Sequence, residues 1–106
     1  MSERWIDVAA SDEVELDWPV GVDAEGQAIC LYRLADGIFA TAAKCTHGDA
    51  NLADGLIVDG ARIECPLHEG TFDIRSGQAT GAPCTVPLRC FRVRVVGSRV
   101  EVGVGD

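Results

Sequence analysis

Two pairs of metal-binding side chains stand out in this chain of 106 residues. Cys45-Thr-His47 forms the first pair and Cys65-Pro-Leu-His68 the second, with the seventeen residues 48–64 between them. Thiolate and imidazole groups are both good metal ligands, so these four side chains together can hold one metal centre. A chain with such a centre must fold so that two separate loops meet at one end of the molecule.

The order of the ligand types favours a two-iron cluster. A structural zinc site usually groups its cysteines in one half of the motif and its histidines in the other. Here each loop supplies one cysteine and one histidine. That order suits a cluster in which both cysteines bind one iron and both histidines bind the other. A zinc-stabilised interaction module is the alternative.

The segment between the two pairs supports a shared site. Asp59-Gly60 separates two short apolar runs, which is typical of a β-hairpin. This hairpin returns the chain and brings His47 and Cys65 to the same end of a small sheet. Gly48 and Gly70 follow the histidines closely, and we expect them to permit tight turns in the two loops.

The remaining pattern indicates an all-β fold. Valine, isoleucine, leucine and threonine alternate or cluster between turn residues, and Asp36-Gly37 and Gly97-Ser98 read as further hairpin turns. A chain of this length has room for one modest core, so we expect a single domain. The expected strands are residues 5–8, 27–34, 38–41, 56–58, 62–64, 91–96 and 99–104.

Charge and cysteine use limit the possible partners and compartment. Nine basic and seventeen acidic residues give a net charge of −8, which is unfavourable for binding nucleic acid or an anionic membrane. We see no secretory signal and no apolar stretch long enough to span a bilayer, and expect a cytoplasmic protein. Cys30, Cys84 and Cys90 lie outside the motif, and we expect them to be free thiols with no part in the metal site.

The chain resembles the soluble Rieske ferredoxins of bacterial aromatic-ring-hydroxylating dioxygenase systems. The resemblance is dense from about Lys44 to Pro83. It is carried by Cys45-Thr-His47-Gly48, Cys65-Pro-Leu-His68-Glu-Gly70, Thr71-Phe-Asp73 and Ser76-Gly77.

This resemblance implies a fold and a ligand set. The fold is a Rieske-type antiparallel β sandwich over residues 1–106, with a small cluster-binding subdomain inserted in it. The subdomain carries two loops at about residues 44–51 and 64–72, and a third, covering loop maps onto Gly81-Ala-Pro83. One Rieske [2Fe-2S] cluster per chain is expected, and its ligands are Cys45, His47, Cys65 and His68.

The sequence offers no catalytic site besides the cluster. Both histidines of the chain belong to the ligand set, so none remains for a mononuclear iron site. No Gly-x-Gly-x-x-Gly turn is present for a dinucleotide. We therefore expect a one-electron carrier that has no catalytic activity of its own.

The resemblance also implies the partners of this carrier. It would take electrons from a flavin-dependent ferredoxin reductase and deliver them to the terminal oxygenase of an aromatic-ring-hydroxylating dioxygenase, and we expect it to act as a monomer. The alternative is a Rieske subunit of another redox enzyme, similar to a nitrite reductase small subunit. We expect the His47–His68 edge to be the electron port, with Asp49 and Glu69 attracting a basic partner.

Overall fold

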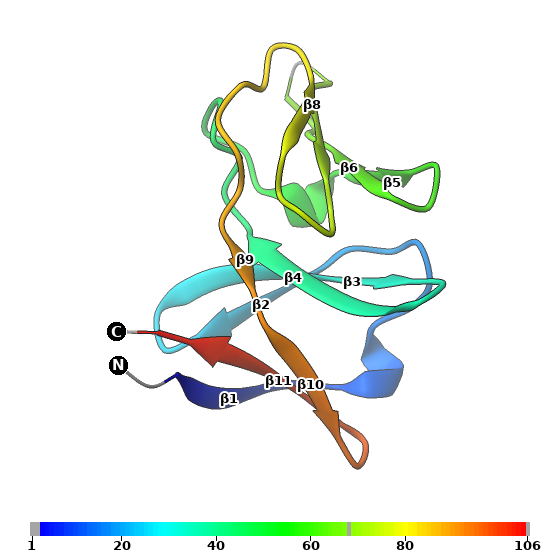
Figure 1. The fold of residues 1–106 in the computed structure, drawn as a ribbon, viewed down its shortest axis with the longest axis vertical. Coiled ribbons are helices and arrows are strands. Elements are labelled where there is room, and N and C mark those ends of the chain that lie inside the picture. The colour runs from blue at the N-terminus through cyan, green and yellow to red at the C-terminus, as the bar shows by residue number, and fades with distance from the viewer. Residues whose placement is uncertain (1–2, 68, 106) are drawn as a thin grey trace.

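The computed structural model describes residues 3–67 and 69–105 and shows an all-β molecule (Figure 1). Its only helical segments within these residues are two short 3-10 turns, η1 (Ser11–Glu13) and η2 (Leu52–Asp54). No helix in the described part of the chain is long and apolar enough to cross a membrane.

The strands form three antiparallel sheets. The first has the order β1-β11-β10, from strands Arg4–Ala10, Arg99–Val104 and Val93–Val96. The second has the order β2-β3-β4-β9, from strands Val20–Ala24, Gln27–Leu34, Gly37–Ala42 and Cys90–Phe91. The third has the order β5-β6-β7-β8, from strands Leu56–Val58, Arg62–Glu64, Thr71–Asp73 and Ala79–Gly81.

The first two sheets form a base, and the third stands at one end of it as a subdomain (Figure 1). The subdomain strands β5 to β8 lie in sequence between β4 and β9, so the subdomain is an insertion in the base. Because β1 pairs with β11 from Arg4 opposite Val104, the first and last strands lie together, far from the subdomain. The expected antiparallel sandwich with an inserted subdomain is confirmed.

Strand β3 separates two apolar cores. Side chains alternate between the two faces of a strand, so a strand covered on both faces reads as a continuous apolar run. Ile29 and Leu31 face the first sheet, together with Val100 and Val102, whereas Cys30 and Tyr32 face the subdomain. All four β3 side chains are fully buried. The subdomain therefore packs directly on the central sheet of the base.

The three predicted hairpins are confirmed. β3 pairs with β4, β5 with β6 and β10 with β11, all antiparallel. The predicted single strand over residues 91–96 is wrong, because the chain changes sheets at Arg92. Phe91 pairs with Ala40 of β4, whereas Val93 pairs with Val102 of β11. Strands β2, β7 and β8 were not predicted.

Most basic side chains of the base are already paired with carboxylates. The pairs that join its elements are Arg4 with Glu25, Arg92 with Glu3, Arg94 with Glu101 and Arg99 with Asp7. These carboxylates neutralise the arginines that they contact. Exposed pairs of this kind are individually weak, about 0–1 kcal/mol.

Candidate metal centre

The first loop follows β4 and is closed by backbone hydrogen bonds. The N–H of Cys45 donates to the carbonyl of Ala50 at 3.0 Å, and the N–H of Leu52 donates to that of Ala43 at 2.7 Å. The side chain of Asn51 then caps η2 by accepting from the N–H of Ala53 at 2.8 Å. These bonds hold Cys45 at the base of a compact turn.

The second loop joins β6 to β7. The N–H of Cys65 donates to the carbonyl of Gly70 at 2.7 Å, which closes the loop directly above the two strands. Glu69 takes the left-handed conformation, with φ at 60°, whereas Gly70 does not. Our expectation that Gly70 permits the turn is therefore wrong. Gly70 is needed for another reason, because a methyl group there would collide with the sulfur of Cys84.

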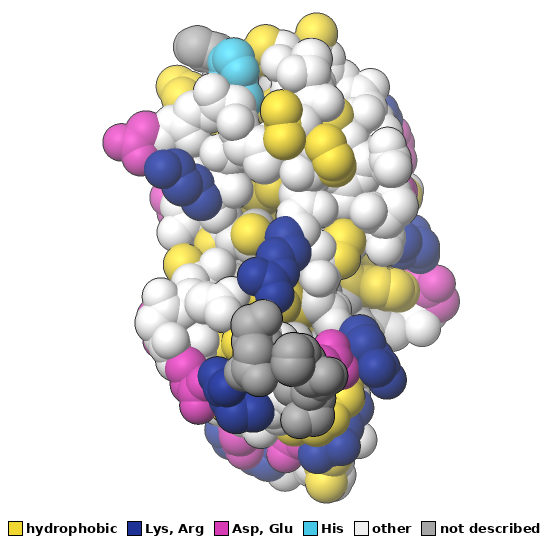
Figure 2. All heavy atoms as spheres, turned by 60° about the vertical axis from the view of Figure 1, so that its left-hand side comes forward, with side chains coloured by type: hydrophobic (Ala, Val, Ile, Leu, Met, Phe, Trp, Pro, Cys, Tyr) yellow, Lys and Arg dark blue, Asp and Glu magenta, His cyan; other side chains and the backbone are white. Residues whose placement is uncertain are grey.

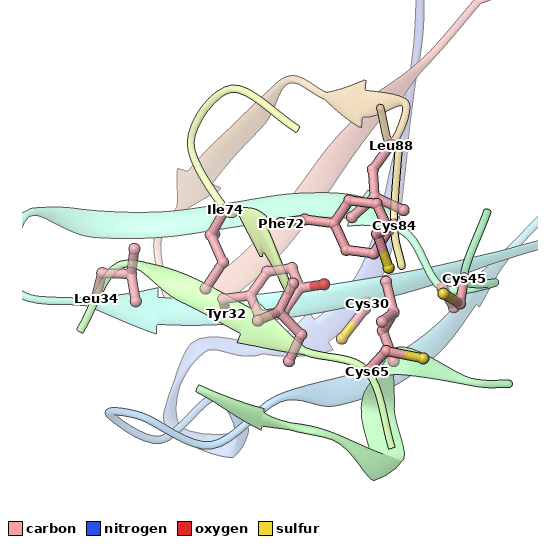
Figure 3. Packing of buried hydrophobic residues seen from close by; sticks show 12 residues of the cluster. Cys30, Tyr32, Leu34, Cys45, Cys65, Phe72, Ile74, Cys84 and Leu88 are labelled. Carbon is pink, nitrogen blue, oxygen red and sulfur yellow. The ribbon is translucent and has the colours of Figure 1, made fainter. Parts of the chain in front are cut away.

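The two cysteine thiols of the motif are buried together. Cys45 is 2% exposed and Cys65 is 1% exposed. Both belong to the core between the subdomain and β3, where Figure 3 shows their sulfur atoms at one edge of the cluster, on the side of Cys84. Two thiols this close in an apolar setting are unfavourable as free anions, but they suit a metal that neutralises them.

Backbone N–H groups point at these sulfur atoms. The N–H of Leu67 donates to the sulfur of Cys65 at 3.4 Å. The sulfur of Cys45 accepts from the N–H groups of His47 and Gly48. Such donors stabilise negative charge on a thiolate and are a common outer shell of metal-bound cysteines.

The pKa values of the three clustered thiols move apart. Burial raises the pKa of Cys45, but the N–H groups and the neighbouring thiols outweigh it and leave this pKa below its usual value. Burial and the proximity of Cys45 raise the pKa of Cys65. Burial and the charge of Cys45 raise the pKa of Cys84 to about 11.

His47 lies on the surface beside the buried thiols. Its side chain is exposed, and Figure 2 shows the histidine colour at the upper end of the molecule, near hydrophobic side chains. In this view the lower end carries more of the charged side chains. His68, the fourth predicted ligand, lies outside the described residues. The structure thus brings together Cys45 and Cys65, and His47 lies two residues after Cys45 in the chain.

The remaining cysteines differ from one another. All three are free, Cys30 and Cys84 are buried, and Cys90 is exposed. Cys84 was expected to have no part in the site, yet its sulfur lies within hydrogen-bonding reach of that of Cys45. It lies fourteen residues beyond Gly70, and neither that spacing nor a recognisable motif marks it.

The segment that carries Cys84 covers the two loops. Cys84 packs on Gly70 of the second loop, and the hydroxyl of Thr46 in the first loop donates to the carbonyl of Val86 at 2.6 Å. These contacts agree with the covering loop expected at Gly81-Ala-Pro83. No three histidine, cysteine or carboxylate side chains within residues 3–67 and 69–105 form a single-ion site. Cys45, Cys65 and Cys84 therefore do not surround one ion.

The donor set fits a cluster that takes two thiolates on its inner side. The two adjacent buried thiols, with N–H groups directed at their sulfurs, provide soft ligands on the core side of the site. The exposed imidazole beside them provides a borderline ligand on the solvent side. This division is the one expected when cysteines bind one iron and histidines the other. The site is thus that of an iron–sulfur electron-transfer protein.

Comparison with known proteins identifies the family. The Rieske [2Fe-2S] domain model matches residues 4–92, and the chain belongs to this family. It is 41% identical to the ferredoxin component of the naphthalene 1,2-dioxygenase system of Pseudomonas aeruginosa, over 96% of this chain and 97% of that one. The chain carries a Rieske [2Fe-2S] cluster, and the zinc alternative is rejected.

Solved structures agree with this assignment. One match is a chain from the solved complex of reduced oxygenase and oxidised ferredoxin in carbazole 1,9a-dioxygenase. The TM-score is 0.86 at 38% identity, over 93% of this chain and 92% of that one. A nitrite reductase small subunit from Mycobacterium tuberculosis has a TM-score of 0.86 at 22% identity, over 98% and 97% of the two chains. At that identity the likeness shows the fold alone.

Proposed function

We propose that this protein is the ferredoxin component of an aromatic-ring-hydroxylating dioxygenase system. It accepts one electron from a flavin-dependent reductase and delivers it to the terminal oxygenase. The observation that carries this proposal is the pairing of buried Cys45 and Cys65 with an exposed His47 at one end of the molecule. The carbazole ferredoxin, whose structure includes its oxygenase, supports the choice of partner.

We propose Cys45, His47, Cys65 and His68 as the complete ligand set. Cys45 and Cys65 would hold the inner iron, and His47 and His68 the outer one. The cluster supplies one-electron chemistry when bound. The protein holds the two thiolates away from water and keeps N–H donors on their sulfurs.

The histidine side of the site is the electron port in this proposal. Electron transfer slows steeply with distance, so a partner must approach the side of the centre that is nearest to the surface. The cysteine side is closed by Tyr32 and Phe72, which are fully buried. His47 is exposed, and Leu67, 37% exposed, adds an apolar contact that suits brief association.

The surface around this port is acidic. A hollow beside the two loops is lined by Asp49, Asp54, Lys44 and Leu67, and Glu69 is exposed in the second loop. None of these carboxylates takes part in the ion pairs that neutralise the base. A partner with a basic patch would therefore meet unneutralised charge here, which speeds association.

Reversing the charge of the port should slow transfer to the partners. In Asp49→Lys with Glu69→Lys we expect the association rate with the oxygenase at low salt to fall about tenfold, because steering raises such rates by ~10–1,000-fold. The wild-type rate should fall as salt rises, since the Debye length is about 10 Å at 0.1 M. The variant should lose that dependence. Stopped-flow oxidation of the reduced ferredoxin by the oxygenase measures both.

The matched control changes the same amount of charge far from the port. Asp12 and Glu15 are exposed in and after η1, at the other end of the molecule (Figure 1). Asp12→Lys with Glu15→Lys should slow association much less. Equal losses in the two double variants would show that only net charge matters and would refute docking at the histidine side.

Reconstitution tests the proposed function itself. Purified reductase, oxygenase and this ferredoxin should together convert an arene to its dihydroxylated product, and omission of the ferredoxin should stop turnover. A ferredoxin that the reductase reduces but no such oxygenase reoxidises would contradict the proposal.

A further inference from the structure

Cys84 lies against the two cysteines that the proposed ligand set assigns to the inner iron. It is 5% exposed and belongs to the same buried cluster as Cys45, whose sulfur lies within hydrogen-bonding reach of its own. Figure 3 shows the sulfurs of Cys45, Cys65 and Cys84 gathered at the edge of the core formed by Tyr32 and Phe72. Such a thiol is in a position to influence the centre without binding it.

Both loops fix the position of Cys84. Its sulfur rests on the backbone of Gly70, where a side chain would displace it. Its N–H donates to the carbonyl of Gly81 at 3.1 Å, and the Thr46 hydroxyl holds Val86, two residues further on, at 2.6 Å. These contacts hold the backbone of Cys84 over the two loops and its sulfur against Gly70.

The direction of the hydrogen bond follows from charge. A metal-bound cysteine has lost its proton, so the sulfur of Cys45 can only accept. Cys84 can only donate, and ionising it would place a third negative sulfur in a buried site beside the other two. Cys84 is thus a neutral thiol whose S–H points at a ligand sulfur.

We propose that Cys84 donates an S–H···S hydrogen bond to the sulfur of Cys45 in the cluster-loaded protein and thereby raises its reduction potential. Reduction adds negative charge to the cluster and its sulfur ligands, so a donor at such a sulfur stabilises the reduced state more than the oxidised one. Cys84 is a positioning residue that acts through Cys45. The inference rests on the proposed ligand set.

Replacing the thiol by a methyl group tests this role. The hydrogen bond is present in both redox states, so only its gain in strength on reduction shifts the potential. A gain equal to the difference between a neutral and a charged acceptor should make Cys84→Ala about fivefold harder to reduce at a fixed ambient potential. That factor corresponds to a potential lower by ~40 mV for one electron. Cys84→Ser keeps a donor of similar size and should stay within half of that shift. Spectroelectrochemical titration of the purified holoproteins measures both potentials.

Cys30→Ala is the matched control. Cys30 is fully buried in the same core, on β3, and its sulfur contacts the carbonyl of Leu31 at 4.0 Å instead of a ligand cysteine. Its removal leaves a cavity of the same size but should not change the potential. Equal shifts in Cys30→Ala and Cys84→Ala, or equal shifts in Cys84→Ala and Cys84→Ser, would overturn the inference in favour of a packing effect.

The wild-type protein gives a second test that does not depend on variant stability. The infrared S–H stretch that Cys84→Ser removes should move to lower frequency on reduction of the cluster, because the hydrogen bond strengthens. A band that stays at the same frequency in both redox states would overturn the inference. Loss of iron in Cys84→Ser would instead make Cys84 a ligand and overturn the proposed ligand set as well.

Discussion

Serine at Cys45 or Cys65 should abolish the cluster. Iron–sulfur centres require thiolates, and an alcohol in the same place is a hard and poorly ionised ligand. We expect each single variant to lose the visible absorption and nearly all iron and acid-labile sulfide. Both residues are at most 2% exposed, so the change also places a polar hydroxyl in the core. Metal and sulfide analysis of the freshly purified protein measures the loss.

The other cysteines are the controls for this prediction. Cys90→Ser changes an exposed thiol and should leave iron and sulfide at the wild-type level. Cys30→Ser and Cys84→Ser should keep the cluster as well, although a buried hydroxyl costs some stability in each, about 1–3 kcal/mol when it lacks a partner. A cluster that survives Cys45→Ser or Cys65→Ser would refute the ligand assignment.

Alanine at Gly70 should destabilise the loaded protein without changing any ligand. The new methyl group would overlap the sulfur of Cys84 and also approach its backbone nitrogen and Cβ at 3.2 Å. Overpacking of this kind costs typically ~1–3 kcal/mol. For a domain of this size that corresponds to a thermal midpoint lower by roughly 10 °C. Loss of visible absorption on heating, at one scan rate, reports the midpoint.

A second substitution shows whether this collision is the cause. In the Gly70→Ala, Cys84→Ala double variant the sulfur is gone. The loss of unfolding free energy should therefore be smaller than the sum of the two single losses, by a coupling of ~0.5–3 kcal/mol. Gly105→Ala is the control, since nothing lies within 4 Å of a methyl group there. It should change the midpoint very little. Strict additivity of the two single effects would contradict the proposed contact.

Local pattern was enough to predict the longer strands and the hairpins between them. β3, for example, was predicted with its observed bounds. Its run of apolar residues identifies it as a strand without knowledge of its distant partners. β7 and β8 have three residues each, too few for a period to show, and unlike the equally short β5 and β6 they do not flank an Asp-Gly turn. β2 contains glycine and aspartate and becomes a strand through its pairing with β3.

The change of sheets at Arg92 was invisible for a related reason. Residues on both sides of it alternate as they would in one strand, and only the partners differ. A sequence pattern shows which residues face a core, but it does not show which sheet the strand joins. Tertiary packing of the two sheets of the base decides where the strand is divided.

The site divides in the same way into local and distant parts. The two cysteine–histidine pairs were recognisable because each lies within four residues of chain, and the Asp59-Gly60 hairpin between them is observed. Cys84 was missed because a covering segment from beyond β8 delivers it. The purpose of Gly70 was misread for the same reason, since its neighbour is distant in sequence.

Histidine ligation is the central claim and can be measured directly. The chain has two histidines, His47 and His68, so selective ¹⁵N labelling of histidine places the label at these two residues alone. Pulsed EPR of the reduced, labelled holoprotein should show strong coupling of the unpaired electron to two ¹⁵N nuclei, one from each ring. Coupling to one histidine nitrogen or to none would contradict a centre held by two cysteines and two histidines.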